Sequence, residues 1–333
     1  MIAIPAAFAR FVDQARNGKM ALWRVFVAVL LIGLIWLIFS LAAFLSVAFY
    51  TGAFDDLASA GASEGWPFGE EFFGSPAGLA AILSSFIGIW LGIWLAVWLL
   101  HSRPFASVLG GAGRLSGSNF SRGLAAALIV SALSEAAFYV ADPSIVRSEV
   151  PLGAWLIWLA PLTLALFVQI SAEELAFRGY LMQSLAALFR SPIIWAGIPG
   201  LFFTLLHWDP NAAPAMNAAM LVSIAAFAAT ATFLVYRTGD LGAAMGVHLG
   251  INFFSILVVS RITWLDGAAL LTGRPVDSAG WTTGDAIWLA ILSVAMFAII
   301  LWLLLAARSP LRVGAPAQPA AGAAVPFTNA VGS

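Results

Sequence analysis

The sequence predicts an all-α fold: a polytopic membrane helical bundle of about eight transmembrane helices, with both termini cytoplasmic. Three observations predict it, namely the composition, the length of the uncharged apolar stretches and the distribution of Lys and Arg. Of the 333 residues, 62% are hydrophobic and 9% are charged, whereas soluble domains are about half apolar and a quarter charged. The mean hydropathy is +0.97. A water-soluble globule is therefore excluded.

Eight stretches are candidates for membrane spans. Each crossing needs about 20 apolar residues, because a helix rises roughly 1.5 Å per residue across about 30 Å of hydrocarbon. Five stretches hold no acidic or basic side chain: Val25–Tyr50, Gly78–Leu100, Ala212–Tyr236, Leu241–Ser260 and Ala286–Ala307. Three weaker stretches complete the set: Gly123–Val140, which carries Glu135, Leu152–Ser171, which contains Pro161, and Ile193–Leu206.

The basic residues predict the orientation, because cytoplasmic loops collect Lys and Arg. Placing the N-terminus inside leaves only three of the 15 basic residues outside: Arg147, Arg261 and Arg274. The outer loop between Thr51 and Ser75 holds five acids and no base. This orientation divides the chain into a cytoplasmic or interfacial segment (1–24), a transmembrane helical domain (25–308) and a disordered cytoplasmic tail (309–333). Apolar and charged residues mix before Lys19, which predicts a short helix on the membrane surface.

Charge and cysteine content exclude several classes of function. The formal net charge is −1 and the pI is near 6.3, so no basic surface is left to bind nucleic acid. The chain has no Cys. Disulfides, thiolate metal sites, iron–sulfur clusters and a cysteine nucleophile are therefore excluded.

Two of the three histidines and a pair of acids fall in apolar segments, where an ionisable side chain costs at least a few kcal/mol. These residues are Glu173, Glu174, His207 and His248. Such a costly set indicates a functional site inside the membrane. His101 is different, because it stands at a predicted cytoplasmic helix end, and we assign it a structural role.

The predicted depths bring three of these groups together. We expect the helix that carries Glu173 to run from near Pro161 to Phe189, which places Glu173 roughly 24 Å from the cytoplasmic end of that helix. The next helix brings His207 to a similar depth. A later helix carries His248 about 11 Å in, and tilt and uneven helix ends allow the three to converge.

Residue spacing adds two local contacts. His248 and Asn252 are four residues apart, so they project from one face of a helix toward a common point. Glu174 and Arg178 have the same spacing and the favourable order of acid before base. We therefore expect these two to form an ion pair.

That pairing leaves Glu173 without a local partner. A desolvated, unpaired carboxylate is suited to act as a general base near neutral pH. His207 is the nearest candidate to share a proton with it or to orient a water molecule. The sequence thus predicts acid–base chemistry at Glu173.

Three short motifs carry a family resemblance. Glu173-Glu174-Leu-Ala-Phe-Arg178 reads EExxxR, Phe203-Thr-Leu-Leu-His207 reads FxxxH, and His248-Leu-Gly-Ile-Asn252 reads HxxxN. In this order, on separate hydrophobic helices, they resemble the CPBP family, the CAAX-protease and bacteriocin-processing membrane proteins, also called the ABI family of intramembrane glutamic endopeptidases. The CPBP-like core would span residues 161–260, with Glu174 and Arg178 in supporting roles.

The resemblance implies a peptidase mechanism without a covalent intermediate. Glu173 and His207 would activate the attacking water, while His248 and Asn252 would stabilise the oxyanion of the tetrahedral intermediate. It implies no cofactor. The implied partners are membrane lipid and a peptide or membrane-protein substrate, with prenylation a possibility within the family.

Alternatives stay open beside this interpretation. The HExxH motif of membrane zinc proteases is absent, and no serine-type or aspartyl-type pattern fits a span. A zinc site made of Glu173, His207 and His248 is a further option. From other classes come a transporter that uses intramembrane Glu and His, supported by Glu135, and a non-catalytic immunity or partner protein. The Arg-heavy, Ala-rich composition suits a bacterial inner (plasma) membrane.

Overall fold

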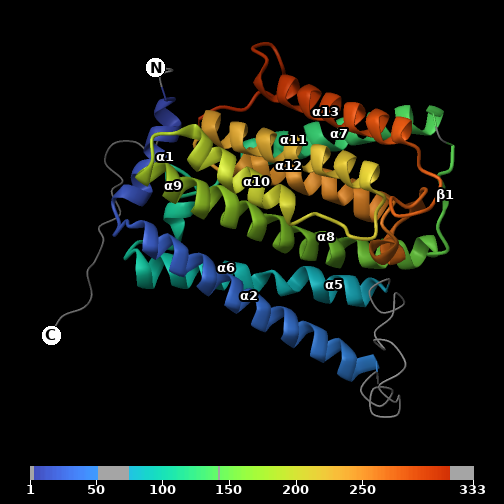
Figure 1. Cartoon of the computed structure of the whole chain (residues 1–333), viewed down its shortest axis with the longest axis horizontal. Helices are drawn as coiled ribbons and strands as arrows, with labels where there is room; N and C mark the ends of the chain where they lie inside the picture. Colours follow the sequence, from blue (N-terminus) through green and yellow to red (C-terminus); the bar gives the residue numbers. More distant parts are fainter. Residues whose placement is uncertain (1–3, 52–74, 142, 316–333) are drawn as a thin grey trace.

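Apolar helices make up most of the structure, a computed structural model that describes residues 4–51, 75–141 and 143–315 (Figure 1). Within these residues, six helices are long and apolar enough to cross a membrane: Leu22–Phe49, Pro76–Leu100, Gly117–Val140, Leu152–Leu188, Pro214–Thr238 and Thr283–Leu305. Two shorter apolar helices, Ile193–Leu205 and Gly242–Val258, complete the set. The expected polytopic helical bundle is confirmed. The acidic outer loop and most of the tail expected to be disordered lie outside the described residues.

Most of the described residues lie in helices. Their bounds are α1 Ala6–Arg16, α2 Leu22–Thr51, α5 Pro76–Ser85, α6 Ile87–Leu95, α7 Gly117–Ala141, α8 Leu152–Glu174, α9 Gln183–Leu188, α10 Ile198–Leu205, α11 Pro214–Thr238, α12 Gly242–Asn252 and α13 Thr283–Leu305. Turns of π-helix extend several of them, at Ala96–Leu100, Leu175–Met182, Ile193–Gly197 and Phe253–Val258. Short 3₁₀ helices cover Phe105–Val108 and Thr263–Ala268.

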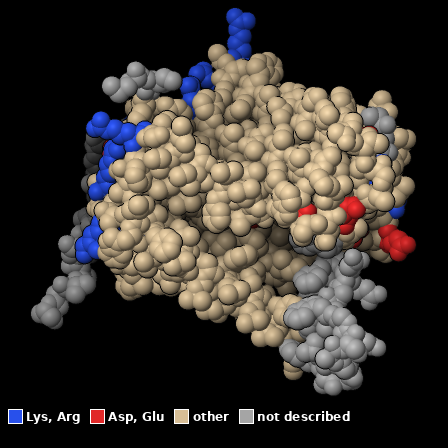
Figure 2. All heavy atoms as spheres, viewed as in Figure 1, with Lys and Arg blue, Asp and Glu red and all other residues tan. Residues whose placement is uncertain are grey.

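The two ends of the bundle differ in charge. Figure 1 shows α1 at one end and the strand β1 (Val146–Arg147) at the other. Figure 2 shows Lys and Arg gathered at the first end, which we call the basic end, and Asp and Glu toward the second, with an uncharged face between them. The second end, here the sheet end, holds a three-stranded sheet in the order β1-β3-β2, made of Val146–Arg147, Leu271–Thr272 and Val259–Ser260. An uncharged belt between two polar ends is the surface a membrane requires.

α8 is longer than the sequence indicated. It begins at Leu152 and continues through Pro161, which was expected near its start, and with its π-helical extension and α9 it reaches Leu188. Near the basic end, the Tyr180 hydroxyl lies 2.8 Å from Nε2 of His101, which directly follows the span Pro76–Leu100. The residues after Tyr180 therefore project beyond that span. Glu173 lies only about 10 Å inward from Tyr180, by the rise of a helix.

α12 packs very closely against α7. Gly242, Gly246 and Gly250 recur every four residues and face α7, where a Cβ on Gly250 would lie 2.6 Å from the Cβ of Ala127. A Cβ on Gly246 would collide with the carbonyl oxygen of Phe120. Small residues at this spacing let two membrane helices approach closely. The glycine face fixes the rotation of α12, so that His248 and Asn252, which lie off this face, are directed toward α8.

The amphipathic helix expected before Lys19 is α1. Its Phe8 is buried against the rings of Trp195 and Tyr236, with ring centroids 5.0 and 5.1 Å away. The side chain of Gln183 donates a hydrogen bond to the carbonyl oxygen of Phe11. α1 therefore packs onto the basic end of the bundle, against α9 and α11.

Candidate active site

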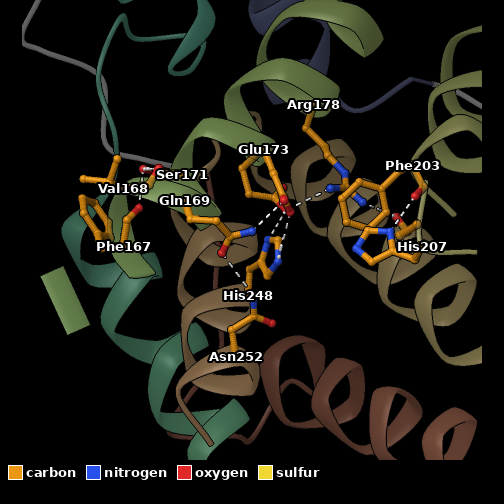
Figure 3. A network of polar contacts seen from close by, with 12 residues as sticks. Phe167, Val168, Gln169, Ser171, Glu173, Arg178, Phe203, His207, His248 and Asn252 are labelled. Carbon is orange, nitrogen blue, oxygen red and sulfur yellow. Dashed lines mark hydrogen bonds and ion pairs between the residues drawn. The ribbon is translucent and has the colours of Figure 1, made fainter. Parts of the chain in front are cut away.

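Polar side chains from α8 and α12 meet inside the bundle, as Figure 3 shows. Glu173 and Glu174 end α8, and the π-helical turn that follows carries Arg178. His248 comes from α12. Turns of π-helix inside longer helices are rare and frequent at functional sites. These two segments, some 75 residues apart in the chain, place two acids, a guanidinium and an imidazole in contact.

Glu174 and Arg178 form the predicted ion pair. The distance between Oε1 of Glu174 and Nη1 of Arg178 is 2.9 Å, and both side chains are buried, at 0% and 2% exposure. The guanidinium also lies over the ring of Phe203, 4.7 Å from the centroid, and 5.3 Å from the ring of Phe227. A charge this deeply buried is tolerated only when it is paired, and the pair together with the aromatic faces meets this need.

His248 contacts both acids. Its Nδ1 lies 2.9 Å from Oε1 of Glu174 and its Nε2 lies 3.6 Å from Oε2 of Glu173. A carboxylate oxygen only accepts, so Nδ1 of His248 carries a proton and donates it to Glu174. Nε2 and the Glu173 carboxylate then face each other with no protein group between them. A proton on Nε2 would stabilise an anion at this position.

Glu173 was expected to lack a local partner, and here the structure differs. Nε2 of Gln169, one helical turn earlier, donates a hydrogen bond of 2.6 Å to Oε1 of Glu173. The other oxygen, Oε2, is buried and has no hydrogen-bond partner among the described residues. The side chain as a whole is 13% exposed. One carboxylate oxygen is thus held in place, and the other is buried without a hydrogen-bond partner among the described residues.

Asn252 and His207 flank this centre from two sides. Asn252 lies one turn beyond His248, and its Nδ2 is 3.3 Å from Oε1 of Gln169. His207 follows the end of α10, with its Nδ1 2.8 Å from the carbonyl oxygen of Phe203. In the described part of the chain, no hydrogen bond or ion pair joins His207 to Glu173, and the imidazole beside Glu173 is that of His248. Phe203 contacts both imidazoles, with ring centroids 4.8 Å from His207 and 6.3 Å from His248.

Two other polar groups singled out in the sequence lie apart from this centre. Glu135 on α7 forms two hydrogen bonds with Arg261 near the sheet end, of 2.8 and 2.7 Å. His101 is buried at the basic end, between the carbonyl oxygen of Lys19 and the Tyr180 hydroxyl. Among the described residues, no group of three or more His, Asp or Glu side chains is arranged to hold a metal ion.

A buried acid fixes the start of the helix that carries His248. The carboxylate of Asp240 accepts hydrogen bonds from the backbone N–H of Gly242 at 2.7 Å and from Nδ2 of Asn119 at 2.9 Å. Burial raises the pKa of Asp240, while these hydrogen bonds partly counter the rise. Asp240 ties the turn between α11 and α12 to α7, which adds to the glycine contacts in placing α12.

Two features of the site escaped the sequence interpretation. Gln169 was not considered because it is uncharged, although its spacing of four residues from Glu173 is the signal that reveals the contact. The glycine repeat of α12 has the spacing of a close helix contact, and that pattern was readable. Gln169 contacts Glu173, and the glycines help to place His248 and Asn252, and all three of these residues were predicted site residues.

Comparison with known proteins places the centre within one matched region. Residues 153–254 match the family model described as Type II CAAX prenyl endopeptidase Rce1-like. This segment of the chain is similar to that family. The Rce1-like segment contains all of the candidate site residues from Gln169 to Asn252, and it excludes the Glu135–Arg261 pair. The match confirms the resemblance to the CPBP family.

A curated relative extends the similarity beyond this segment. The uncharacterized protein YyaK of Bacillus subtilis (strain 168) is 27% identical over 202 residues, which cover 56% of this chain and 67% of that protein. No solved structure matches the chain significantly. The chain is therefore a multi-pass membrane protein with an Rce1-like segment at its centre.

Proposed function

We propose that this protein is an intramembrane endopeptidase of the CAAX-protease type, in which Glu173 activates the attacking water. The observation that carries the proposal is the free Oε2 of Glu173, buried and 3.6 Å from Nε2 of His248. A water bound beside this oxygen would contact the base Glu173 and, when the His248 ring is protonated on both nitrogens, a donor at Nε2. The Rce1-like match around both residues supports a peptidase.

The proposed steps follow from the hydrogen-bond roles of each group. Glu173 takes a proton from the water as its oxygen attacks the peptide carbonyl, and later passes that proton to the leaving amine. The oxyanion that forms is stabilised by Nδ2–H of Asn252 and by Nε2–H of His248, whose ring carries a proton on both nitrogens for this step. Glu174, paired with Arg178, holds the imidazole through Nδ1. No covalent link to the protein forms.

His207 has a distinct place in this proposal. Because a carbonyl oxygen only accepts, Nδ1 of His207 must donate to Phe203, which leaves Nε2 of the neutral ring as an acceptor. We assign this nitrogen to orienting the water or the substrate once a peptide occupies the space beside Phe203. Substitution of His207 should therefore lower the cleavage rate less than substitution of Glu173 does.

The proposed substrate is a membrane-attached peptide, either prenylated or not, in keeping with the printed description of the matched family. We also propose that the basic end faces the cytoplasm of a bacterium and that the membrane is the plasma membrane. The clustering of Lys and Arg at that end supports this orientation (Figure 2). Accessibility tags fused to each end of the chain would test it.

A transporter is less well supported by the structure. That alternative drew on Glu135 as an intramembrane carboxylate, but both oxygens of Glu135 accept hydrogen bonds from Arg261. A carboxylate held by a guanidinium on both oxygens is unsuited to relay protons. Proteoliposome uptake would test this alternative directly.

The decisive experiment is a cleavage assay with matched acid variants. Purified protein is incubated with peptides that end in a CAAX sequence, farnesylated and unmodified, and with membranes whose proteome is compared before and after. Glu173→Gln should lower the cleavage rate by about 10³-fold. Glu149→Gln, at an exposed position near the sheet end, is the control and should cleave at the wild-type rate.

Two results would contradict the proposal. Cleavage that is unchanged by Glu173→Gln would overturn the site. The absence of any cleaved peptide or membrane protein would overturn the peptidase activity.

A further inference from the structure

Gln169 links two groups of the site and belongs to none of the three motifs. It lies on α8 one turn before Glu173 and is 8% exposed. Its Nε2 donates to Oε1 of Glu173 at 2.6 Å, and its Oε1 accepts from Nδ2 of Asn252 at 3.3 Å. One side-chain amide therefore connects α8 and α12 across the centre (Figure 3).

The direction of this chain of hydrogen bonds is fixed by chemistry. An ionised carboxylate only accepts, so the amide group of Gln169 must turn its NH₂ toward Glu173. Its carbonyl oxygen is then turned toward Asn252, whose NH₂ group must donate the hydrogen bond between them. The charge on Glu173 thus sets the orientation of Gln169, and Gln169 sets that of Asn252.

Each end of this series of hydrogen bonds leaves one polar group of the site in a defined position. At Glu173, Oε1 is occupied, so Oε2 is the oxygen that remains for a water. At Asn252, one N–H bonds to Gln169, and the second N–H has no acceptor among the residues that the structure describes. An oxyanion hole requires N–H groups whose direction is set before the reaction.

We propose that Gln169 is a positioning residue, which holds the base Glu173 and orients the amide of Asn252 for the oxyanion. This inference rests on the proposed function. The residue contacts no reacting atom, and it acts through the two residues that do. Gln169 lies outside the EExxxR, FxxxH and HxxxN motifs, and its role is inferred from its contacts alone.

The first test replaces the amide by an apolar side chain of similar length. Gln169→Met should lower kcat by roughly 10- to 100-fold with KM within about twofold, because substrate contacts are kept while transition-state contacts are lost. The acidic limb of the pH–rate profile should move to higher pH, since the ionised Glu173 has lost a donor. Thermal unfolding in detergent checks that the variant is folded.

A matched control exists on the same continuous helix. Gln183 is fully buried and donates to the carbonyl oxygens of Phe11 and Ser107, away from the site. Gln183→Met should lower the unfolding temperature and leave the pH–rate profile of the folded protein unchanged. A change of profile in both variants would show that loss of a buried amide, rather than positioning, is the cause.

A second test separates the two links. Gln169→Glu keeps an acceptor for Asn252 and removes the donor to Glu173. It should shift the acidic limb upward more than Gln169→Met does, because two adjacent carboxylates hold a proton more readily. The cost of Asn252→Ala should stay large in the Gln169→Glu background and become small in the Gln169→Met background, where Asn252 is already misdirected.

The outcomes separate this inference from the proposed function. If the wild type cleaves and Glu173→Gln does not, but Asn252→Ala costs the same in all three backgrounds, Gln169 has no positioning role. An unmoved pH–rate profile in Gln169→Met would overturn it as well. If the wild type cleaves nothing, the proposed function itself has failed.

Discussion

In the part of the chain that the structure describes, two Glu–Arg pairs lie within the helical bundle, and they differ in how far their contacts extend. The outer pair, Glu135 and Arg261, is bidentate, with 23% and 16% of the side chains exposed. The inner pair, Glu174 and Arg178, is buried and joined by a single oxygen that also accepts from His248. Among the described residues, the side chains of the outer pair hydrogen-bond only to each other, whereas the inner pair is part of a larger network.

The difference shows that a charge at membrane depth is not by itself a functional site. Arg261 lies over the ring of Phe138, 4.3 Å from the centroid, and joins α7 to the segment after β2. This is a structural contact at the sheet end. Oε1 of Glu174 also accepts a hydrogen bond from His248, whose Nε2 faces Glu173. This wider network is what favours a catalytic role for the inner pair.

The largest expected effect comes from removing the inner arginine. Arg178→Met leaves the fully buried Glu174 without its guanidinium partner and with only the hydrogen bond from His248, which should cost about 3–5 kcal/mol of unfolding free energy. Arg261→Met leaves Glu135 partly accessible to water, and about 1 kcal/mol is expected. Thermal unfolding of both variants in the same detergent compares them. Equal losses would mean that the two pairs do not differ as described.

Neutralising each pair completely should sharpen the contrast. Glu174→Gln with Arg178→Met removes both inner charges, so we expect about 2 kcal/mol of the stability lost in Arg178→Met to return. The proposed peptidase activity should still fall strongly, because His248 loses a charged partner. Glu135→Gln with Arg261→Met should keep that activity. Wild-type activity in the first double variant, measured per folded molecule, would argue against the network.

The smallest effect concerns His101, a buried imidazole whose partners are neutral. Burial lowers the pKa of His101 below its ordinary value of 6.5, and the hydrogen bond to Lys19 only partly opposes this. The folded protein therefore binds this proton less readily than the unfolded chain, so stability falls as the pH drops below about 6.5. The loss should be smaller than that of Arg261→Met.

The measurement is the unfolding temperature between pH 7.5 and pH 5, compared with His101→Gln. The glutamine can donate to the Lys19 carbonyl and accept from Tyr180 without titrating. A flatter pH dependence in this variant is expected. The same slope in both proteins would place the titrating group elsewhere.

Local spacing explains what was predictable from the sequence. Glu174 and Arg178 are four residues apart on one helix, so their ion pair followed from helix geometry alone. The membrane spans followed from apolar length, and Leu152–Leu188 differed chiefly in where it starts and how far it projects. That projection depends on the contact between Tyr180 and His101, which lie 79 residues apart.

Long-range contacts explain what was not predictable. The partner of Glu173 on α12 depends on the depth of two helices with uneven ends, and His248 rather than His207 meets it. The rotation of α12 depends on glycines that only a close approach to α7 makes necessary. Gln169 is only four residues from Glu173, but burying a neutral amide in an apolar helix costs less free energy than burying a charge. Its presence there therefore points less clearly to a functional role.

The most direct test of the central claim compares one acid from each pair. Glu174→Gln keeps the size of the side chain and an acceptor for His248 but removes the charge, and Glu135→Gln does the same at the outer pair. Peptide cleavage is measured per folded molecule for both. The account predicts a fall of about 10²-fold for Glu174→Gln and a rate within about twofold of wild type for Glu135→Gln. Equal rates in the two variants would contradict it.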